Sequence, residues 1–502
     1  MNRRIAALAA GALLAAGTAL AAGTALAAGT DAAKDSLTLG MVLEPPHLDP
    51  TAGAASAIRE VTYANIYEGL TRIDHDGQVR PGLAESWSIS TDGLTYTFKL
   101  VGGVKFHDGS PFNCDVVKFS YGRATAPDSV NAQKQLFEPI ADVSCPDQYT
   151  AVVKLKRPTA LFLFDMGWGD AVMVSPKSAA TNKTDPVGTG PFRFKQWVHG
   201  DRVVLERNPD YWGAAPKLKT VTFKFVADPS AATAAVLAGD IDAFPLFPAP
   251  EAIDQFKADP RFKVVIGTTE GKTIVALNNT RKPFDDVRVR RALTYAIDRS
   301  ALIDAAMSGY GKPIGSHYVP TDPGYVDLTG TYPYDPEKAK QLLKDAGVAP
   351  GTEITIMLPP PSYARRGGEV IAAMWEKVGI KTKLVPIEWA QWLDQVFMRT
   401  DYQATIISHT EARDLDIYAR DKYYFNYHSD AYRALYEKFV QTVDAKAQLE
   451  QVGELQKKLA EDEPNVFLFA LAKVGVANAK LRGLWENDPV PANDVTGVSW
   501  AE

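Results

Sequence analysis

Polar and apolar residues alternate in short runs through the first half of the chain, which is typical of paired strands. Residues 87–90 and 95–100 flank Asp92-Gly93, a dipeptide that favours a tight hairpin turn. Residues 192–198 and 202–207 form a second hairpin-like pair. Further strands are expected at 37–42, 151–155 and 221–226, with helices at 61–70, 112–123 and 230–238. Hairpins therefore dominate the middle of this half.

In the second half, helical periodicity alternates with short apolar runs. The predicted helices span 287–307, 336–346, 367–378, 390–398 and 429–459. The predicted strands span 274–278, 354–358, 382–386, 404–408 and 466–471. Alternation of this kind indicates α/β layers, so the chain as a whole is predicted to be a mixed α/β protein.

The first 27 residues have the features of a secretory signal peptide. Arg3 and Arg4 precede an uncharged run rich in Ala, Leu and Gly, and the pattern Ala-Leu-Ala occurs at 19–21 and 25–27. The run is also long enough for a membrane anchor, but Ala, Gly and Thr gain little on transfer into lipid. We therefore expect cleavage of residues 1–27 and export to the periplasm, where thiols tend to be oxidised.

Composition narrows the functional classes. The 502 residues are 46% hydrophobic and 23% charged, with a formal net charge of −6, as in an ordinary globular protein. The chain has no basic block, which argues against nucleic acid as a partner. Two cysteines are too few for a disulfide scaffold or an iron–sulfur cluster.

Signals for catalysis are weak. The segment GTTEGKT at 267–273 has three residues between its glycines where a phosphate loop has four, so a structural turn is expected. No serine occupies a Gly-x-Ser-x-Gly elbow, and no two of the seven histidines have the spacing of metal ligands on one helix. Acidic pairs such as Asp285-Asp286 are typical of caps and turns. A secreted hydrolase is thus disfavoured, and we expect no catalytic residue, metal or cofactor.

Several short segments carry a resemblance that covers nearly the whole chain beyond the signal peptide. They are YEGLTR at 67–72, VRPGLAESW at 79–87, YTFKL at 96–100, VKFHDGSPF at 104–112, GTGPF at 188–192, RNPDYW at 207–212, AGDID at 238–242, VRVRRAL at 287–293 and YDP at 334–336. In this order they resemble the extracytoplasmic solute-binding proteins of family 5, which serve peptide and nickel ABC importers.

The resemblance implies an α/β fold of the two-lobed periplasmic binding protein type (type II, cluster C), with a hinge of two crossing strands. Lobe I would comprise 31–73, an inserted subdomain at 74–186, 187–268 and a C-terminal return at 480–502, and lobe II would comprise 269–479. The resemblance further implies a small solute held between the lobes, delivery to the permease subunits of an ABC transporter in the inner membrane, and a monomeric protein.

Lobe II contains the segment that bears on the ligand. An ungapped resemblance to dipeptide-binding members of the family runs from Ala364-Arg365-Arg366 through Trp389 to Asp414. It places Glu411 where those proteins hold the ligand's ammonium with a carboxylate, and Trp389 on a tryptophan of their cleft. The other expected ligand-binding residues are Glu44, His409, Arg413 and Asp414. A peptide or related amine-bearing solute is therefore expected, and a nickel chelate, an opine, a glutathione-like ligand and an oligosaccharide are alternatives on the same scaffold.

The resemblance fails at one informative place. The arginine that holds a dipeptide's carboxylate corresponds here to Leu358, within the apolar run Leu-Pro-Pro-Pro at 358–361. This run cannot pair with a carboxylate. Arg413, Arg420 or Arg365 would have to take over that role if the ligand carries one.

Each of these residues also has a purely structural interpretation. Glu411 and Arg413 could pair with each other on a solvated loop, Trp389 could belong to the core, and Glu44 could stand in a plain turn. The run YYFNY at 423–427 either walls an apolar pocket or fills the core of lobe II.

Cys114 and Cys145 both fall in the inserted subdomain that the resemblance implies. Export and the even number of cysteines favour a disulfide between them. The alternative is two separate buried thiols.

Overall fold

The computed structural model describes residues 34–501, so the predicted signal peptide at 1–27 lies outside the described residues. No helix within 34–501 is long and apolar enough to cross a membrane. The described chain from Asp35 onward packs as a single unit.

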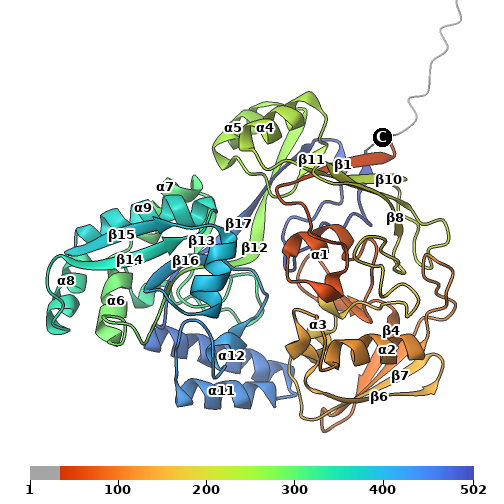
Figure 1. Ribbon diagram of the computed structural model, residues 1–502, viewed down its shortest axis with the longest axis horizontal. Coiled ribbons are helices and arrows are strands. Elements are labelled where there is room, and N and C mark those ends of the chain that lie inside the picture. Colours follow the sequence, from red (N-terminus) through yellow and green to blue (C-terminus); the bar gives the residue numbers. More distant parts are fainter. Residues whose placement is uncertain (1–33, 502) are drawn as a thin grey trace, which may run out of the picture. The chain divides into compact units, whose positions relative to one another are not determined.

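Two long strands join the halves of one large sheet. The sheet has the order β15-β14-β16-β12-β17-β11-β1-β10-β9-β8, with β13 (Gly311–Pro313) beside β17. β12 (Phe262–Leu277) and β17 (Val466–Asn478) run antiparallel along most of their length. Figure 1 shows this pair passing between the two groups of elements. We call the group on the β1 side lobe I and the group on the β14 side lobe II.

Lobe I contains five strands of the large sheet. They are β1 (Ser36–Met41), β8 (Phe192–Val198), β9 (Arg202–Arg207), β10 (Thr220–Phe225) and β11 (Ala243–Phe244). β8 and β9 form the predicted hairpin, and β1 pairs in parallel with β10. Other elements of this lobe are α1 (Ser56–Thr62), α4 (Pro229–Ala238), α5 (Ile253–Ala258), β18 (Leu481–Arg482) and β19 (Ser499–Trp500). The chain therefore returns to lobe I at its C-terminal end.

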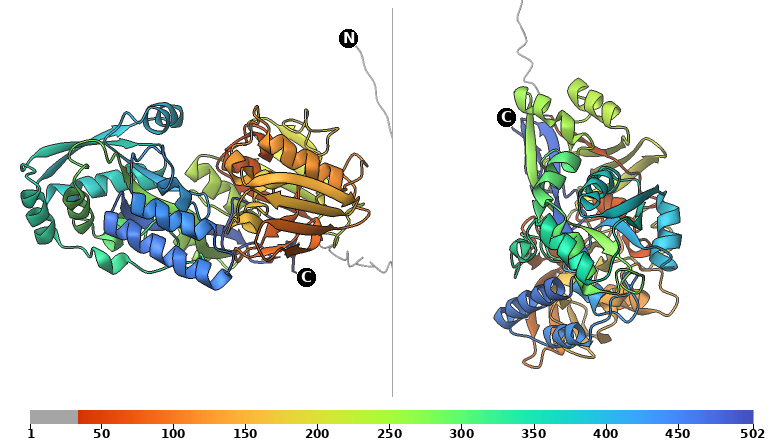
Figure 2. Two further views of the ribbon diagram at one scale, coloured as in Figure 1. Left: turned by 90° about the horizontal axis from the view of Figure 1, so that it is seen from below. Right: turned by 90° about the vertical axis from the view of Figure 1, so that its left-hand side faces the viewer.

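A separate four-stranded sheet also belongs to lobe I, in the order β4-β5-β7-β6. The strands are β4 (Ala84–Ile89), β5 (Thr95–Leu100), β6 (Ile140–Asp147) and β7 (Thr150–Leu155). Their buried side chains share a core with α2 (Cys114–Thr125), and Figure 2 shows the sheet and this helix as two layers. Cys114 and Cys145 are joined by a disulfide with their Cα atoms 5.7 Å apart. We refer to this sheet with α2 as the four-stranded subdomain.

Short elements make up other segments of lobe I. They are β2 (Thr71–Ile73), β3 (Val79–Pro81) and α3 (Phe162–Asp165), and the 3₁₀ turns η1 (Pro50–Ala52), η2 (Lys134–Phe137), η3 (Gly169–Ala171) and η4 (Pro250–Ala252). β2 and β3 pair antiparallel, and the turn between them carries Gly77.

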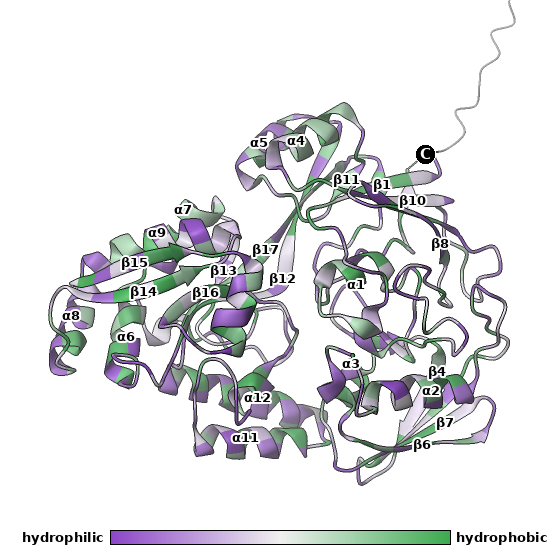
Figure 3. Ribbon diagram, in the orientation of Figure 1, coloured by the Kyte–Doolittle hydropathy of each residue, from purple (hydrophilic) through white to green (hydrophobic). Residues whose placement is uncertain are grey.

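Lobe II is built on β14 (Thr352–Leu358), β15 (Ile380–Pro386) and β16 (Ala404–His409). Their apolar side chains share one core with α6 (Val287–Tyr295), α7 (Arg299–Met307), α8 (Pro336–Asp345) and α9 (Ser362–Glu376). A second core contains side chains of α11 (Asp430–Val440) and α12 (Ala445–Asp462). Figure 3 shows that α8 carries hydrophilic residues as well as hydrophobic ones, as a helix at the surface of a core should.

The other elements of lobe II are α10 (Trp389–Gln391), the π-helix η6 (Trp392–Met398) and the 3₁₀ turns η5 (Thr329–Thr331) and η7 (Leu415–Tyr418). The predicted helix at 390–398 is therefore mostly wound as a π-helix, a conformation that is rare and often found near functional sites.

Two predicted helices are each interrupted by a capping aspartate. Within 287–307, Asp298 accepts a hydrogen bond from the backbone N–H of Ala301 and starts α7 as a new helix. Within 429–459, Asp444 accepts from Ala447 N and starts α12. Aspartate is a strong N-cap, so it restarts the helix with a new direction where apolar periodicity alone predicts continuity.

The predicted helix at 61–70 is wrong, because α1 ends at Thr62. The hydroxyl of Tyr63 donates a hydrogen bond to Gly167 O, and Ala64 has a left-handed φ of 59°. Contacts to distant parts of lobe I thus turn the chain here.

The segment 267–273 is not a turn, as the sequence predicts, but part of β12. The pairing with β17 shifts between Thr268 and Lys272, which marks an irregularity of the bulge type. A Cβ on Gly267 would come within 2.0 Å of the backbone oxygen of Glu486. Glycine is therefore needed for close approach of two chain segments, not for holding phosphate.

Candidate ligand-binding site

The loop at 410–414 follows β16 and carries three of the predicted ligand-binding residues. The ammonium of Lys272, on the neighbouring strand β12, donates a hydrogen bond to the backbone oxygen of Glu411. Arg413 adopts a left-handed backbone conformation with φ of 57°. Within residues 34–501, the half-buried Glu411 carboxylate makes neither a hydrogen bond nor an ion pair.

Asp414 is the centre of a buried ion-pair network. Its carboxylate lies 2.9 Å from Lys272 Nζ and 3.2 Å from His317 Nε2, and the side chain of Lys272 is 0% exposed. Burial by itself raises the pKa of Asp414, but Lys272 and His317 outweigh that effect and hold it well below its usual range. Burial likewise opposes the charge on Lys272, yet Asp414 raises the Lys272 pKa above its ordinary value. Both groups are therefore charged at neutral pH.

Two histidines complete the network and are oriented by tyrosines. His317 Nδ1 lies 3.0 Å from the Tyr418 hydroxyl, and His409 Nε2 lies 2.8 Å from the Tyr424 hydroxyl. The other ring nitrogen of each histidine faces Asp414. Burial lowers the pKa of His317 and, together with His317, lowers that of His409 to about 3. Both imidazoles are thus neutral.

His317, His409 and Asp414 have the residue types and spacing of a metal-binding group, with candidate ligand atoms within 4.8 Å of one another. Two histidines and one carboxylate are a recognised set of transition-metal ligands. However, the Lys272 ammonium already neutralises Asp414 at 2.9 Å, so a divalent ion would have to displace or repel a buried cation. The geometry fits an ion-pair network better than a metal centre.

A second pair of carboxyl groups extends the network toward lobe I. Arg413 Nε donates to Asp322 Oδ1 at 3.3 Å, and both side chains are largely buried. Burial, with the nearby Asp322, raises the pKa of Glu270 well above its ordinary value. Burial also raises the pKa of Asp322, with Arg413 and Lys272 opposing the shift.

Lobe I contributes two further carboxyl groups whose pKa values respond to residues of lobe II. Asp170 pairs with Arg59 at 3.0 Å; burial raises its pKa to about 6, with Arg59 opposing and Glu411 adding to the shift. Burial and Asp416 raise the pKa of Asp165 to about 8, with Arg413 opposing. Asp165 is thus neutral at pH 7.

The structure brings four of the six predicted ligand-binding residues together: His409, Glu411, Arg413 and Asp414. The suggested pair between Glu411 and Arg413 does not form, because Arg413 pairs with Asp322. His409 and Asp414 are buried in the network described above, and Glu411 is the member with a free carboxylate.

The other two predicted residues lie elsewhere. Glu44 accepts hydrogen bonds from Trp197 Nε1 at 2.9 Å and Gly200 N at 3.0 Å, so it fastens the β8–β9 hairpin. Trp389 is 39% exposed and packs edge-on against Trp392, with ring centroids 5.8 Å apart. The alternative that Trp389 belongs to the core is therefore wrong.

The three arginines suggested as carboxylate partners are all engaged. Arg365 pairs with Glu388 at 3.2 Å, Arg420 pairs with Asp416 at 2.6 Å, and Arg413 pairs with Asp322. Leu358 is buried in the core of lobe II. None of these positions offers an unpaired cation to a ligand carboxylate.

Sequence reasoning missed the partners of Asp414 and Arg413. Lys272, His317 and Asp322 lie on β12 and on the loop after β13, far from residue 414 along the chain. One signal was present, since Lys272 lies two residues before the apolar run 274–277 of a strand. The aromatic run 423–427 belongs mostly to the core of lobe II, where Tyr424, Phe425 and Tyr427 are buried.

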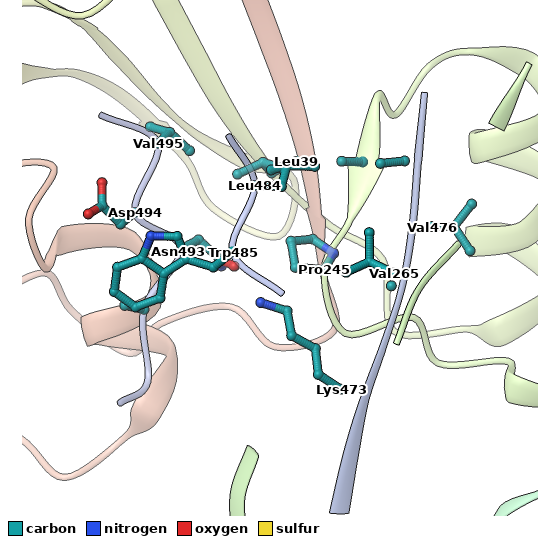
Figure 4. A pocket seen from close by; sticks show the side chains of 14 residues that line it. Leu39, Pro245, Val265, Lys473, Val476, Leu484, Trp485, Asn493, Asp494 and Val495 are labelled. Atoms are coloured by element: carbon teal, nitrogen blue, oxygen red, sulfur yellow. The ribbon is translucent and has the colours of Figure 1, made fainter. Parts of the chain in front are cut away.

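A separate cavity lies beside the crossing strands and is shown in Figure 4. Its wall is largely apolar, with Leu39, Pro245 and Val265 among the residues that line it. Lys473 also lines it but forms an ion pair with Asp488. The Lys473 ammonium is therefore already neutralised, and the other charged side chain of the wall, Asp494, accepts hydrogen bonds from Thr496.

Comparison with known proteins gives the chain a family. The family model of bacterial extracellular solute-binding proteins, family 5 (middle region), matches residues 78–435. The dipeptide-binding protein of Escherichia coli is 36% identical over 352 residues, which span 63% of this chain and slightly less than two thirds (65%) of that protein. A glutathione-binding protein of Pectobacterium atrosepticum is 35% identical over 370 residues, 72% of this chain and 70% of that protein.

Solved structures show the same architecture. The periplasmic binding protein DppA of Helicobacter pylori, in complex with the peptide STSA, has a TM-score of 0.82 and 26% identity, covering 94% of this chain and 99% of that one. The oligopeptide-binding protein AppA of Bacillus subtilis, in complex with a nonapeptide, has a TM-score of 0.81 and 25% identity, with coverage of 94% and 99%. The chain therefore belongs to family 5 of the bacterial extracellular solute-binding proteins and has their two-lobed α/β fold.

Proposed function

We propose that this protein is the periplasmic binding component of an ABC importer, which captures a peptide or related amine-bearing solute between its lobes and passes it to a membrane permease. In this proposal residues 1–27 are a cleaved signal peptide, lobe I spans 31–268 with an insertion at 74–186 and a return at 480–502, and lobe II spans 269–479. The protein acts as a monomer, without a cofactor and without chemical change of the solute. Relatives named for dipeptide and glutathione binding support this class of ligand.

The observation that carries the proposal is the free carboxylate of Glu411. Its backbone is fixed by Lys272, whereas the nearby carboxylates of Asp414, Asp322 and Asp416 are each paired with a cation. A half-buried carboxylate without a partner is well suited to bind an ammonium group, since a charge-assisted hydrogen bond strengthens where water is excluded.

The ligand's carboxylate plays a smaller part in this proposal. Leu358 stands where dipeptide-binding relatives have an arginine, and Arg365, Arg413 and Arg420 are already paired. We therefore expect recognition to depend on the amine more than on a terminal carboxylate.

Native mass spectrometry of freshly purified protein is the first test, because a periplasmic binder often retains its solute. Calorimetry should then compare alanyl-leucine, its N-acetyl form, its C-terminal amide and reduced glutathione. We expect stoichiometric binding without turnover, with acetylation weakening affinity far more than amidation, and a ligand-dependent rise in Tm. Equal tolerance of acetylation and amidation, or steady formation of product, would contradict the proposal.

A further inference from the structure

Arg413 connects the 410–414 loop of lobe II to lobe I. Its Nη2 donates a hydrogen bond to the backbone oxygen of Gly77 at 3.1 Å, in the turn between β2 and β3. Its guanidinium carbon lies 4.0 Å from the ring centroid of Phe164, in α3. Both partners belong to lobe I, so one side chain of lobe II makes two contacts across the lobes.

These contacts have the properties of a specific fit. The Arg413 side chain is 12% exposed, and Phe164 is buried in a core of lobe I residues. An arginine that lies flat on an aromatic ring gains a cation–π contact, which strengthens as water is excluded. The planar guanidinium can hold Asp322 with one nitrogen and Gly77 with another at the same time, which a lysine ammonium cannot do with the same geometry.

The backbone of the loop holds Arg413 in place. A left-handed φ is uncommon for residues other than glycine and persists where the surroundings enforce it. On one side Lys272 binds the backbone of Glu411, and on the other side Lys272 and His317 bind Asp414. Arg413 therefore cannot move toward or away from lobe I without disturbing the loop that carries Glu411.

We propose that Arg413 is a positioning residue that couples occupancy of Glu411 to contact between the lobes. An ammonium bound by Glu411 would order the 410–414 loop, and the ordered loop would present Arg413 to Gly77 and Phe164. Contact with lobe I in turn would hold Glu411 in its binding geometry, because coupling between two sites is reciprocal. The ligand part of this inference rests on the proposed function, whereas the contact between the lobes does not.

The distance between the lobes tests the inference without any ligand. Both cysteines of the chain form the disulfide, so cysteines introduced at two exposed positions, Lys118→Cys on α2 and Glu437→Cys on α11, can carry spin labels. Pulsed electron resonance would then give the distance distribution between lobe I and lobe II.

Four variants in this labelled background separate the contributions. Arg413→Ala should lengthen and broaden the distance distribution, and Arg413→Lys should have a smaller effect in the same direction. Phe164→Leu removes the ring from lobe I and leaves the ion pairs of lobe II intact. It therefore reports on the contact between Arg413 and lobe I even if Arg413→Ala folds poorly. The double variant Arg413→Ala/Phe164→Leu should equal Arg413→Ala alone, because the two residues form one contact.

Arg420→Ala is the matched control, since Arg420 pairs with Asp416 and stacks on Tyr423, both within lobe II. It should leave the distribution unchanged. Distributions that coincide for wild type, Arg413→Ala and Phe164→Leu would overturn the inference and reduce Arg413 to an ion-pair partner of Asp322.

Calorimetry with alanyl-leucine tests the ligand part. Arg413→Ala should weaken binding by about tenfold while preserving the discrimination against the N-acetyl form, since Glu411 is still present. If Arg413→Ala leaves the affinity unchanged, ligand binding is not coupled to contact between the lobes, even if the distance between the lobes changes. If wild type binds none of the amine-bearing probes, the proposed ligand class fails, whereas the distance measurement still decides whether Arg413 joins the lobes.

Discussion

The four-stranded subdomain of lobe I and the charge network of lobe II are stabilised in different ways. The subdomain buries alternate apolar residues of its strands against α2, and a disulfide closes the chain between Cys114 and Cys145. The network buries Lys272, Asp414 and His317, which come from three separate segments of the chain. Apolar contacts each contribute a little, whereas every member of a buried ion network depends on its partner.

This difference has a consequence for function. The subdomain carries none of the residues that meet at the 410–414 loop within the described chain. The network holds that loop in place through Lys272. The Glu411 carboxylate, which we propose binds the solute, is therefore positioned by charge pairs rather than by apolar packing. A substitution in the charge network of lobe II should therefore change both stability and ligand binding, whereas a substitution in the subdomain should change stability alone.

Removing the buried cation of lobe II should have the largest effect on stability. Lys272→Met leaves Asp414 buried and without its closest cation, which typically costs about 3–5 kcal/mol. Denaturant unfolding followed by circular dichroism would measure the loss. The double variant Lys272→Met/Asp414→Leu removes both charges and should recover much of it.

The matched control is Lys457→Met, which breaks an exposed pair with Glu454 on α12. Such pairs contribute at most about 1 kcal/mol. A Lys272→Met variant as stable as this control would show that the buried pair is not needed, and the comparison between the two regions would lose its basis.

Opening the disulfide should have a slightly smaller effect, confined to the subdomain. The double variant Cys114→Ala/Cys145→Ala releases a loop with a sequence separation of 31 residues, which corresponds to about 3–4 kcal/mol in the chain-entropy model. Hydrogen exchange resolved by mass spectrometry should show faster exchange in 84–155 and unchanged exchange in lobe II.

Reduction of the wild-type protein should reproduce that result, and reductant should not affect the alanine variant. If exchange accelerates equally in both lobes, the subdomain does not behave as a separately stabilised region.

A smaller effect, on pH dependence, should distinguish Asp165 of lobe I from Asp414 of lobe II. Burial and Asp416 raise the folded-state pKa of Asp165 to about 8, while its ordinary value is 3.8. The folded protein thus binds an extra proton between these values, and this contribution to stability is lost as pH rises toward 8. Asp165→Asn should match wild type below pH 4 and exceed its Tm at pH 9.

Asp414 contributes a pH dependence of stability with the opposite sign. Its pKa is depressed in the folded state, so its contribution is present at neutral pH and is lost only in acid. Thermal scans of wild type and Asp165→Asn from pH 4 to pH 9 would measure the difference. Equal slopes with pH for the two proteins would show that Asp165 does not titrate abnormally.

The subdomain was largely predictable from sequence, and the network was not. The hairpin of β4 and β5 follows from alternating residues around Asp92-Gly93, because side chains, turn and partner strand are all local. The network joins residues 272, 317 and 414, whose proximity depends on how β12 and β16 pair. No local pattern encodes that pairing.

The candidate site also has features that the sequence predicted and features that it did not. The resemblance in lobe II predicted Glu411 and Asp414 as ligand-binding residues, but it gave no indication that Arg413 would contact lobe I or that Asp414 would be buried beside Lys272. The helix breaks at Asp298 and Asp444 were readable in principle, because aspartate before a helical run is a known cap. Apolar periodicity extended across both positions and masked this signal.

The most direct test of the account is the dissociation constant of wild type and Glu411→Gln for the solute found by native mass spectrometry, measured by calorimetry. Glutamine keeps the shape of the side chain and removes its charge, so a bound ammonium would be left without its counter-ion. We predict a loss of affinity of at least about 100-fold, with the Tm of the ligand-free protein changed by no more than a few degrees. An unchanged dissociation constant would contradict the account, because Glu411 would then be a loop residue without a role in binding.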